Sequence, residues 1–429
     1  MTRIGTSEER ASGIRRRKTA RANLEEMRVL VFDPSMSGHH SFYLRLLLPA
    51  LLELSPEVTL VTGRNASESR EFQIQLSDVG ERVRVESVVP PLEGSLVKRG
   101  AAMHHFLTSA IEQFRPDHVY VPAADHLTQI MSLRGRRAML ANGVEMEALM
   151  MRGGFAYPYR GWAQWVQDRL SLLAVERSPW TILHFVDPFP YEMLQRRGGS
   201  IAGRLRLLPD PVEIHPARDR GTARRRLGVP GNGRYLGSVG LMDERKGIDL
   251  LIRAFATMPL EPDDRLLLVG RASPAVQNLL TGPMAHLVRE GRIVSIDRYV
   301  NNEEFSDAVS ALDVVCTPYP QHVGSASIVI RAAAAERPVV SSTFGWVGRI
   351  VPRLDLGWTC DVSDTPALAS TITTALEASA HFRLSEPARR FIRFHSVENF
   401  QAVWTARLRD RLELAPRKQY SWDWVLDVL

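Results

Sequence analysis

Residues that could bind an anion follow a buried apolar stretch in the second half of the chain. Within Asp313–Ser342, a strand is expected to end at Thr317-Pro318, and His322 and Gly324 lie in the loop that follows. Ser325 is expected to open an alanine-rich helix. Backbone amides at a helix start attract anions, and small residues let a ligand approach closely. The pattern predicts a phosphate site, although tight helix packing alone would produce a similar composition.

A second group of charged residues follows another strand of the same half. The stretch Asp243–Gly247 reads DERKG and comes directly after a strand ending at Val239-Gly240. Arg245 and Lys246 would project from the carboxyl edge of a sheet, where fixed positive charge stabilises a leaving diphosphate. The alternative is a solvated turn that Gly247 closes before a helix. Together with the predicted phosphate site, the spacing favours a binding function.

Glycine and histidine near the start of the chain form a third candidate site. In Ser37-Gly38-His39-His40, Gly38 allows a close approach of the backbone and His39 offers a hydrogen-bond donor. Neither a carboxylate nor a cysteine stands nearby at metal-ligand spacing, so a metal site is not predicted. Phosphate contact by Gly38 and His39, or capping of the next helix, are the interpretations that stay open.

Two more polar pairs follow predicted strands of the first half. Asp125 and His126 come after the strand 118–122 and could supply a catalytic acid or base. Glu145 is expected to follow a strand at 138–141 in the same way. The sequence contains no GxSxG elbow, Walker loop or GxGxxG fingerprint, which counts against hydrolases, P-loop proteins and dinucleotide-dependent oxidoreductases.

Short apolar strands that alternate with helices must position these residues. In the first half, strands are expected at 27–34, 58–62, 118–122, 138–141 and 181–185. In the second half, strands are expected at 235–239, 265–269, 293–296, 314–318 and 338–341, and helices at 248–258, 274–290, 302–311 and 325–335. This alternation predicts two doubly wound α/β halves, in which ligands bind beyond the carboxyl ends of the strands. The turn-rich segment 208–216 is the best boundary between them.

Composition excludes several classes of protein. The 429 residues are 45% hydrophobic and 24% charged, which is typical of a soluble globular chain of two or three domains. No apolar stretch is long enough for a transmembrane helix or a signal peptide, and two cysteines cannot make a disulfide framework. We therefore expect a cytoplasmic location.

The net charge of +6 is partly local, because basic residues cluster in 1–26. This segment is predicted to be a disordered, solvated arm. Peripheral contact with the inner face of a membrane is a second hypothesis for it. Nucleic-acid binding is disfavoured because the arm has no aromatic residues that could stack on bases.

With these motifs in view, the chain resembles the GT-B glycosyltransferases, specifically the retaining group often called family 4. The matching features are Lys246-Gly247 before a helix, a strand ending at Val269-Gly270, the segment around 313–318 and the alanine-rich helix before 338–340. The resemblance is strong in the second half and looser in the first, where it includes the Ser37-Gly38 loop.

The resemblance implies that a nucleotide-diphosphate sugar binds in a cleft between two Rossmann-like domains. Lys246 matches the family's lysine that neutralises the diphosphate. Leu241 stands at the position of the family's neighbouring arginine, and Arg245 is the hypothesis for a residue that substitutes for it. The family's pair of glutamates falls on Val323 and Arg331. Arg331 is then expected either to bind a phosphate or carboxylate, or to pair with an acidic residue such as Glu336.

These inferences give one overall hypothesis. The chain is expected to be a hexosyltransferase-type enzyme with an acceptor-side domain at 27–212, a donor-binding domain at 213–405 and a C-terminal helix at 406–429 that packs back on the first domain. It is expected to need no metal or other cofactor, and its acceptor would be a glycan, a lipid or a small molecule. The alternative is a non-catalytic GT-B protein that binds a nucleotide or glycan and partners another transferase.

Overall fold

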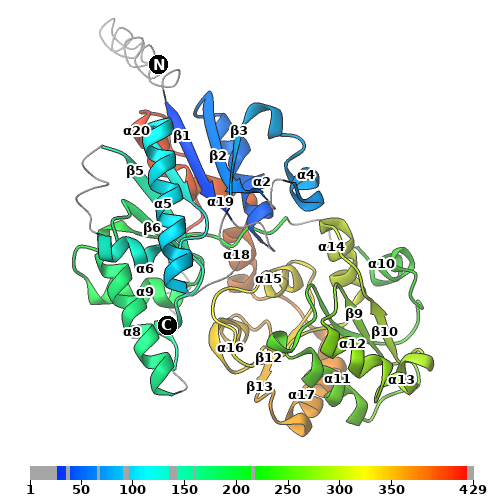
Figure 1. Cartoon of the computed structure of the whole chain (residues 1–429). Coiled ribbons are helices and arrows are strands. Elements are labelled where there is room, and N and C mark those ends of the chain that lie inside the picture. Colours follow the sequence, from blue (N-terminus) through cyan, green and yellow to red (C-terminus); the bar gives the residue numbers. More distant parts are fainter. Residues whose placement is uncertain are drawn as a thin grey trace, which may run out of the picture. The chain divides into compact units, whose positions relative to one another are not determined.

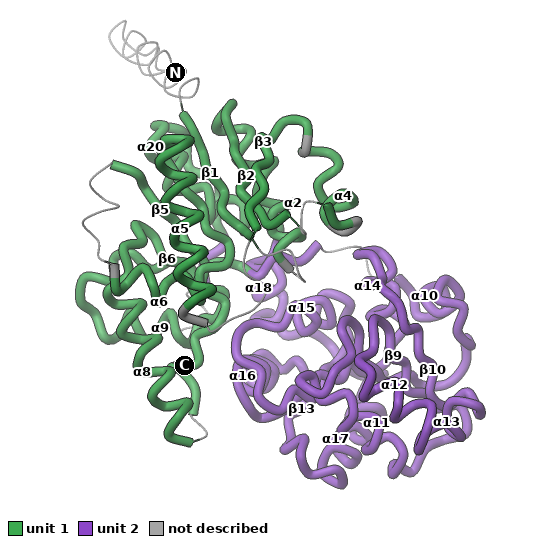
Figure 2. The backbone as a smooth tube through the Cα atoms, in the orientation of Figure 1, with its two compact units in different colours: residues 1–209, 397–419 green, residues 210–396, 420–429 purple. Residues whose placement is uncertain are grey.

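The chain forms two compact units (Figure 2). The computed structural model describes residues 27–34, 39–64, 68–89, 96–134, 143–158, 161–213 and 218–422. Unit 1 comprises residues 1–209 and 397–419, and unit 2 comprises 210–396 and 420–429. The sequence prediction placed these boundaries after 212 and after 405. The predicted basic arm, 1–26, lies outside the described residues.

Unit 1 is built on a parallel sheet with the strand order β3-β2-β1-β4-β5-β6-β7 among its described residues (Figure 1). The strands are β1 Arg28–Asp33, β2 Glu57–Gly63, β3 Arg84–Val88, β4 His118–Val121, β5 Glu145–Met150, β6 Ile182–Phe185 and β7 Leu205–Leu207. The helices are α2 His39–Leu52, α4 Arg70–Leu76, α5 Leu96–Phe114, α6 Asp125–Arg134, α8 Trp162–Arg177, α9 Pro188–Arg197, α19 Val397–Trp404 and α20 Ala406–Arg411. Single 3-10 turns lie at Gly80–Arg82, Gly154–Ala156 and Ala202–Arg204.

Both faces of the unit 1 sheet are buried at its central strands, which explains why β1 and β6 are short, mostly apolar runs. In β1, Val29 and Val31 belong to a core that includes residues of α2 and α19. The alternate residues Leu30 and Phe32 belong to a second core with α5, α6 and α8. The side-chain period of two along a strand produces this division, and it makes the unit doubly wound.

Unit 2 has a second parallel sheet, with the order β10-β9-β8-β11-β12-β13. Its strands are β8 Tyr235–Val239, β9 Arg265–Val269, β10 Ile293–Ile296, β11 Val314–Thr317, β12 Val339–Ser342 and β13 Gly357–Cys360. The helices are α10 Arg220–Leu227, α11 Ile248–Thr257, α12 Pro274–Thr281, α13 Ala285–Arg289, α14 Asn302–Ala311, α15 Ser327–Ala334, α16 Gly345–Arg353, α17 Thr365–Ala378 and α18 Glu386–Phe394, with 3-10 turns at Glu244–Lys246 and Ser379–His381.

The predicted fold class, two doubly wound α/β halves, is confirmed. Several details differ from the prediction. The helix expected over 274–290 is two helices, because Gly282 and Pro283 interrupt it. The strand expected at 138–141 lies outside the described residues, and β3, β5, β7 and β13 were not predicted.

The C-terminal segment also differs from the single helix expected over 406–429. Helix α20 ends at Arg411, and 412–422 contains no further helix. Trp422 is buried in unit 2, where its ring centroid lies 4.7 Å from that of Phe394. The chain therefore leaves unit 2 after α18, contributes α19 and α20 to unit 1, and returns to unit 2 at Tyr420.

Candidate functional site

The candidate site of unit 2 lies at the carboxyl ends of β8 and β11, two neighbouring strands whose connections run to opposite sides of the sheet. From β8 the chain continues to β9 on one side, whereas β11, the other neighbour of β8, continues to β12. The loops after β8 and β11 therefore diverge at the carboxyl edge. A crevice for ligands forms at such a switch point in doubly wound sheets.

Glycines let the loops at this edge pack backbone against backbone. Gly247 has a φ of +66°, and a Cβ atom there would lie 2.0 Å from the carbonyl oxygen of Pro318. Gly345 has a φ of +71°, and its Cβ would lie 2.0 Å from the carbonyl oxygen of His322. Only glycine fits both the left-handed backbone and the close contact. The loop after β11 is thus held on one side by the β8 loop and on the other by the start of α16.

Lys246 reaches the crevice from the loop after β8. Its Nζ atom lies 5.8 Å from the centroid of the Tyr319 ring, and a Cβ atom on Gly240 would be 3.2 Å from the same nitrogen. The Asp243 carboxylate accepts a hydrogen bond from the Lys246 amide at 3.0 Å, which holds the turn. Burial, and then the charge of Arg245, lower the pKa of Lys246 to about 8. An anion bound beside Lys246 would favour the charged ammonium form and so raise this pKa again.

Arg245 lies at the mouth of the same loop. Its side chain is 55% exposed, and its guanidinium is 3.5 Å from the Asp243 carboxylate. Its charge acts on both Lys246 and Tyr319. The two consecutive cations therefore differ in placement, since Lys246 points inward over Gly240 whereas Arg245 stays in solvent.

The loop after β11, where the sequence predicts a phosphate site, ends two residues later than expected. Gly324 has a φ of +98°, Ala326 is extended, and α15 begins at Ser327 rather than at Ser325. The N-cap residue is Ala326, which has no side-chain oxygen to accept hydrogen bonds from the first-turn amides. This helix start therefore offers backbone donors to a ligand.

His322 and Ser325 shape the loop before this helix start. The Nε2 atom of His322 lies 3.0 Å from the carbonyl oxygen of Ser325, so the ring donates across the loop. The Ser325 hydroxyl donates to the Asp210 carboxylate at 2.7 Å. The Asp210 amide in turn lies 3.0 Å from Nδ1 of His395, whose pKa burial lowers to about 3. The neutral His395 ring therefore holds the Asp210 backbone in place, and the Asp210 carboxylate holds Ser325 in the loop. Neither Asp210 nor His395 was predicted from the sequence.

Arg331 joins the same group of side chains through an aromatic ring. Its guanidinium carbon lies 4.9 Å from the centroid of Phe305 in α14. The edge of that ring would be 3.7 Å from a Cβ atom on Gly240, the residue beside Lys246. Glu336, the predicted structural partner of Arg331, lies 3.8 Å from Arg389. Lys246, Arg245 and Arg331 are thus three cations that these contacts associate with the carboxyl edge of unit 2.

The carboxyl edge of the unit 1 sheet holds a second polar group. Nδ1 of His40 lies 2.9 Å from both carboxylate oxygens of Asp33, the buried last residue of β1. Burial opposes the charged ring, but the Asp33 carboxylate raises the pKa of His40 above its usual value, and Asp125 adds to this effect. The sequence analysis did not single out Asp33, although it directly precedes the glycine loop.

Asp125 is the first residue of α6 and holds the loop after β5. Its carboxylate accepts hydrogen bonds from the amides of Met151, at 3.3 Å, and Arg152, at 2.8 Å. Burial raises its pKa despite these bonds. The neighbouring His126 is exposed. Gly38 lies outside the described residues, and for His39 only its place at the start of α2 is described.

Glu145 corrects the predicted position of one strand. It begins β5 instead of following a strand, so it lies at the amino edge of the sheet, where Arg407 of α20 donates to its carboxylate. An acid at that edge cannot act with Asp125, which follows the carboxyl end of β4.

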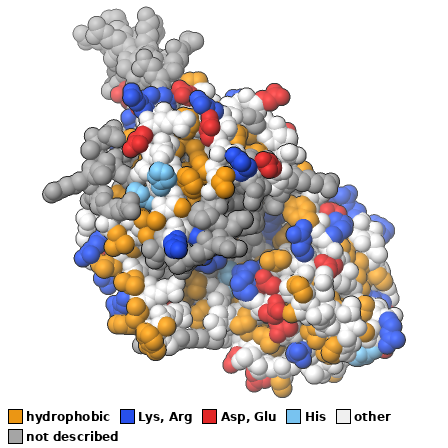
Figure 3. All heavy atoms as spheres, in the orientation of Figure 1, with side chains coloured by type: hydrophobic (Ala, Val, Ile, Leu, Met, Phe, Trp, Pro, Cys, Tyr) orange, Lys and Arg blue, Asp and Glu red, His pale blue; other side chains and the backbone are white. Residues whose placement is uncertain are grey.

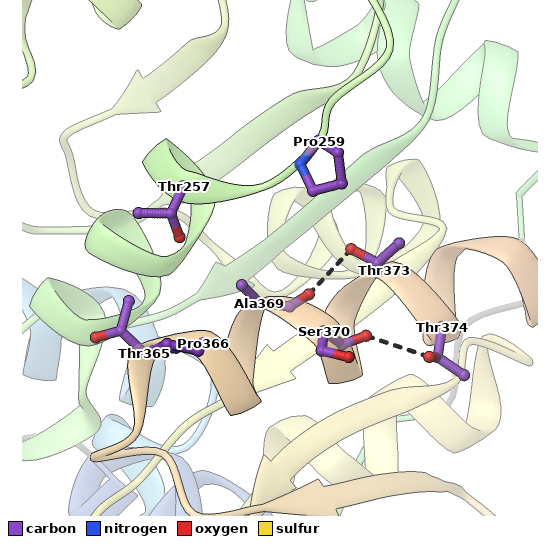
Figure 4. A pocket seen from close by; sticks show the side chains of 8 residues that line it. All are labelled: Thr257, Pro259, Thr365, Pro366, Ala369, Ser370, Thr373 and Thr374. Carbon is purple, nitrogen blue, oxygen red and sulfur yellow. Dashed lines mark hydrogen bonds between the residues drawn. The ribbon is translucent and has the colours of Figure 1, made fainter.

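The surface of unit 2 also has a shallow groove between α11 and α17 (Figure 4). It is lined by Thr257, Pro259, Thr365, Pro366, Ala369, Ser370, Thr373 and Thr374. The Thr373 and Thr374 hydroxyls donate to carbonyl oxygens of their own helix, at 3.0 Å and 3.2 Å, so they are already satisfied. None of the predicted site residues lines this groove.

Over the described ranges, no three His, Cys, Asp or Glu side chains are grouped so that they could hold a metal ion. No helix in the described part of the chain has the length and apolar character needed to cross a bilayer.

Comparison with known proteins relates part of the chain to a known family. Residues 233–378 match the family model described as glycosyl transferases group 1, and this range contains the loops after β8, β9, β11 and β12. Residues 233–378 are similar to group 1 glycosyltransferases, and the chain has a GT-B fold. The predicted resemblance to the GT-B glycosyltransferases is thereby confirmed.

Curated relatives of this group 1 domain include D-inositol 3-phosphate glycosyltransferases. The protein from Corynebacterium glutamicum is 26% identical over 186 residues, which is 41% of this chain and 44% of the relative. The protein from Kineococcus radiotolerans is 30% identical over 205 residues, 45% of this chain and 46% of the relative. The chain therefore matches less than half the length of these relatives.

Solved structures extend the similarity of fold to most of the chain. Sucrose-phosphate synthase from Thermosynechococcus elongatus has a TM-score of 0.69 and 19% identity, covering 90% of this chain and 99% of its own. HepE from Anabaena in complex with UDP has a TM-score of 0.66 and 16% identity, covering 90% of this chain and 100% of its own. At such low identity these structures show the GT-B fold alone.

Proposed function

We propose that the protein transfers a sugar from a nucleotide-diphosphate sugar to an acceptor, with retention of configuration, and that the carboxyl edge of unit 2 binds the donor. The observation that carries this proposal is the position of Lys246, whose Nζ lies over Gly240 and beside Tyr319 at the switch point of the sheet. A partly buried cation at this position complements the charge of an anion that neighbouring backbone amides bind.

The charges of the edge support a diphosphate rather than a neutral ligand. Lys246 supplies one inward positive charge, Arg245 supplies a second at the mouth, and the start of α15 adds backbone donors. Arg331, stacked on Phe305, adds a third cation where the family has a glutamate. We propose that Arg331 binds a phosphate or carboxylate group of the substrates.

The chemistry asked of these residues is stabilisation of a leaving group. When the bond between the anomeric carbon and the diphosphate breaks, negative charge grows on the phosphate oxygens. Preorganised donors that meet this charge lower the barrier, because they bind the transition state better than the ground state. The departing phosphate can take the acceptor's proton on the same face, so retention needs no protein nucleophile.

For unit 1 we propose a part in binding the acceptor, which would be a glycan, a lipid or a small molecule. Asp125 and His126 stay hypotheses for a catalytic acid or base. The raised pKa of Asp125 suits proton transfer, but its two backbone hydrogen bonds also suit a structural part. Gly38 and His39 stay hypotheses for phosphate contact.

A transfer assay with matched variants tests the proposal. UDP-glucose is the first donor to try, because HepE of similar fold has been solved with UDP and with UDP-glucose; other nucleotide sugars follow. Removal of the Lys246 charge by Lys246→Ala should lower kcat/KM by roughly 100- to 1,000-fold. Arg253→Ala, which removes an exposed charge from α11, should stay within about two-fold of the parent.

Binding measurements separate transfer from mere recognition. A nucleotide diphosphate that binds only the folded protein should raise Tm, and Lys246→Ala should lose that shift. Turnover of every accepted donor that is unchanged in Lys246→Ala would contradict the proposal. Binding without turnover of any donor would instead support the non-catalytic alternative.

A further inference from the structure

Helix α8 of unit 1 exposes large apolar side chains along one side. Trp162 is 80% exposed, Leu170 59%, Trp165 42%, Leu173 39% and Val166 38%. In Figure 3, hydrophobic side chains lie together at the lower left, over the part of unit 1 where Figure 1 places α8. Scattered exposed apolar residues are ordinary, but five on one 16-residue helix form a contiguous patch.

The patch is separate from the side of α8 that packs on unit 1. Leu172, Ala174 and Val175 are the buried residues of the helix. Exposed positions 162, 166, 170 and 173 are spaced by four, four and three, which places them in one line along a helix of 3.6 residues per turn. A helix that only covered the core would carry polar side chains along this line. The exposed residues are therefore not explained by the fold of unit 1.

The charges around this patch are positive. Arg169 and Arg177 are exposed, and the guanidinium carbon of Arg169 lies 5.5 Å from the centroid of the Trp165 ring. The two acids of α8 are only partly exposed. Asp168 is partly buried against Gly154, and Glu176 pairs with Arg197 at 3.0 Å. Hence the exposed positions of α8, all within the described residues, carry arginines but no carboxylate.

We infer that the exposed face of α8, defined by Trp162, Trp165, Val166, Leu170 and Leu173, docks on an anionic lipid bilayer. Tryptophan prefers the headgroup region because one part of its ring is apolar and another is polar. A helix that lies in the plane of the interface buries its apolar line, while arginines beside that line attract anionic lipids. The inference does not depend on the proposed transfer reaction.

A second copy of the chain is the main competing occupant. A twofold contact centred on the patch would bring Arg169 close to its counterpart on the other copy, with no exposed carboxylate of α8 on either copy to pair the two arginines. A bilayer with anionic headgroups satisfies both the apolar line and the two cations. The charge pattern thus favours the bilayer.

Vesicle flotation of the full-length chain tests the inference. We expect binding to vesicles of phosphatidylcholine with 30 mol% phosphatidylglycerol, with roughly that proportion of anionic lipid chosen to create a negative surface. The double variant Trp162→Ser with Leu170→Ser should weaken partition by about ten-fold or more, because two exposed apolar side chains no longer insert. The variant Arg169→Gln with Arg177→Gln should weaken binding to anionic vesicles by about five-fold per residue, but not binding to neutral ones.

A matched double variant controls for loss of surface hydrophobicity. Ile74→Ser with Val288→Ser removes two exposed apolar side chains from other surfaces, and should bind vesicles as the parent does. Thermal melting of each variant checks its fold. Equal vesicle binding by the parent and the α8 variant, or binding that only deletion of 1–26 removes, would overturn the inference. A concentration-dependent dimer that the α8 variant abolishes, without any vesicle binding, would point to the second copy and would also overturn it.

Discussion

The pH dependence of donor binding should follow the ionisation of Lys246. Burial and the neighbouring Arg245 lower its pKa to about 8 in the free protein. A group of this pKa is charged in about nine molecules of ten at pH 7, but in about one of ten at pH 9. If only the ammonium form binds the diphosphate, affinity should fall by about ten-fold between these two pH values. The sign follows from linkage, since a bound anion favours the protonated lysine.

Calorimetric titration with a nucleotide sugar between pH 6.5 and 9 measures this dependence. A nucleotide sugar is preferred to a nucleoside diphosphate, because a terminal phosphate itself titrates near pH 6. In Arg245→Gln the fall should begin at higher pH, because the second cause of the lowered pKa is gone. Lys246→Arg, which stays charged throughout, should show no fall. Affinity of the parent that is flat across the whole range would refute the reasoning.

Further predictions concern the stability of the two units. Gly247→Ala should destabilise unit 2 by about 2 kcal/mol or more in urea unfolding, because its Cβ would meet the Pro318 carbonyl, whereas Gly203→Ala, with open space around it, should change little. His395 has its pKa lowered to about 3, so protonation of the unfolded chain should remove up to about 1.4 kcal/mol of stability per pH unit below 6.5; His395→Gln, which does not titrate, should lose that slope. Buried Glu147 accepts hydrogen bonds from His118 at 2.9 Å and His184 at 2.7 Å, so Glu147→Gln should cost about 1–3 kcal/mol, while the exposed Glu112→Gln should be neutral. Unchanged melting of Gly247→Ala or Glu147→Gln, or an unchanged acid slope in His395→Gln, would contradict the corresponding argument.

The sequence predicted the elements of unit 2 better than those of unit 1, for a physical reason. Strands such as β8 and β9 are buried on both faces and read as short apolar runs between turns, so their bounds agree with the structure. Strand β3 is largely exposed at the edge of its sheet and has the sequence RVESV, which carries no such signal. Strand β5 contains two glutamates whose hydrogen-bond partners, in β4, β6 and α20, lie 29 or more residues away along the chain, so local sequence patterns cannot reveal them.

The candidate site was predictable where glycine and charge coincide, and only there. Lys246 and Gly247 stand out because a cation next to a glycine follows a buried strand, and in the structure the Lys246 Nζ lies beside Tyr319 and Gly240 at the switch point. The link from Ser325 to Asp210 joins residues 115 positions apart, and His395 is further still from Asp210 along the chain. Such contacts depend on the folded topology. The later start of α15 is likewise tied to the contact of Ser325 with Asp210 and to the non-helical backbone of Gly324 and Ala326.

A crystal structure of the protein with a bound nucleotide-diphosphate sugar tests the central claim most directly. We predict that the phosphate oxygens lie within hydrogen-bond distance of Lys246 Nζ and of backbone amides at the start of α15. A donor bound with its diphosphate away from the loops after β8 and β11 would contradict the account.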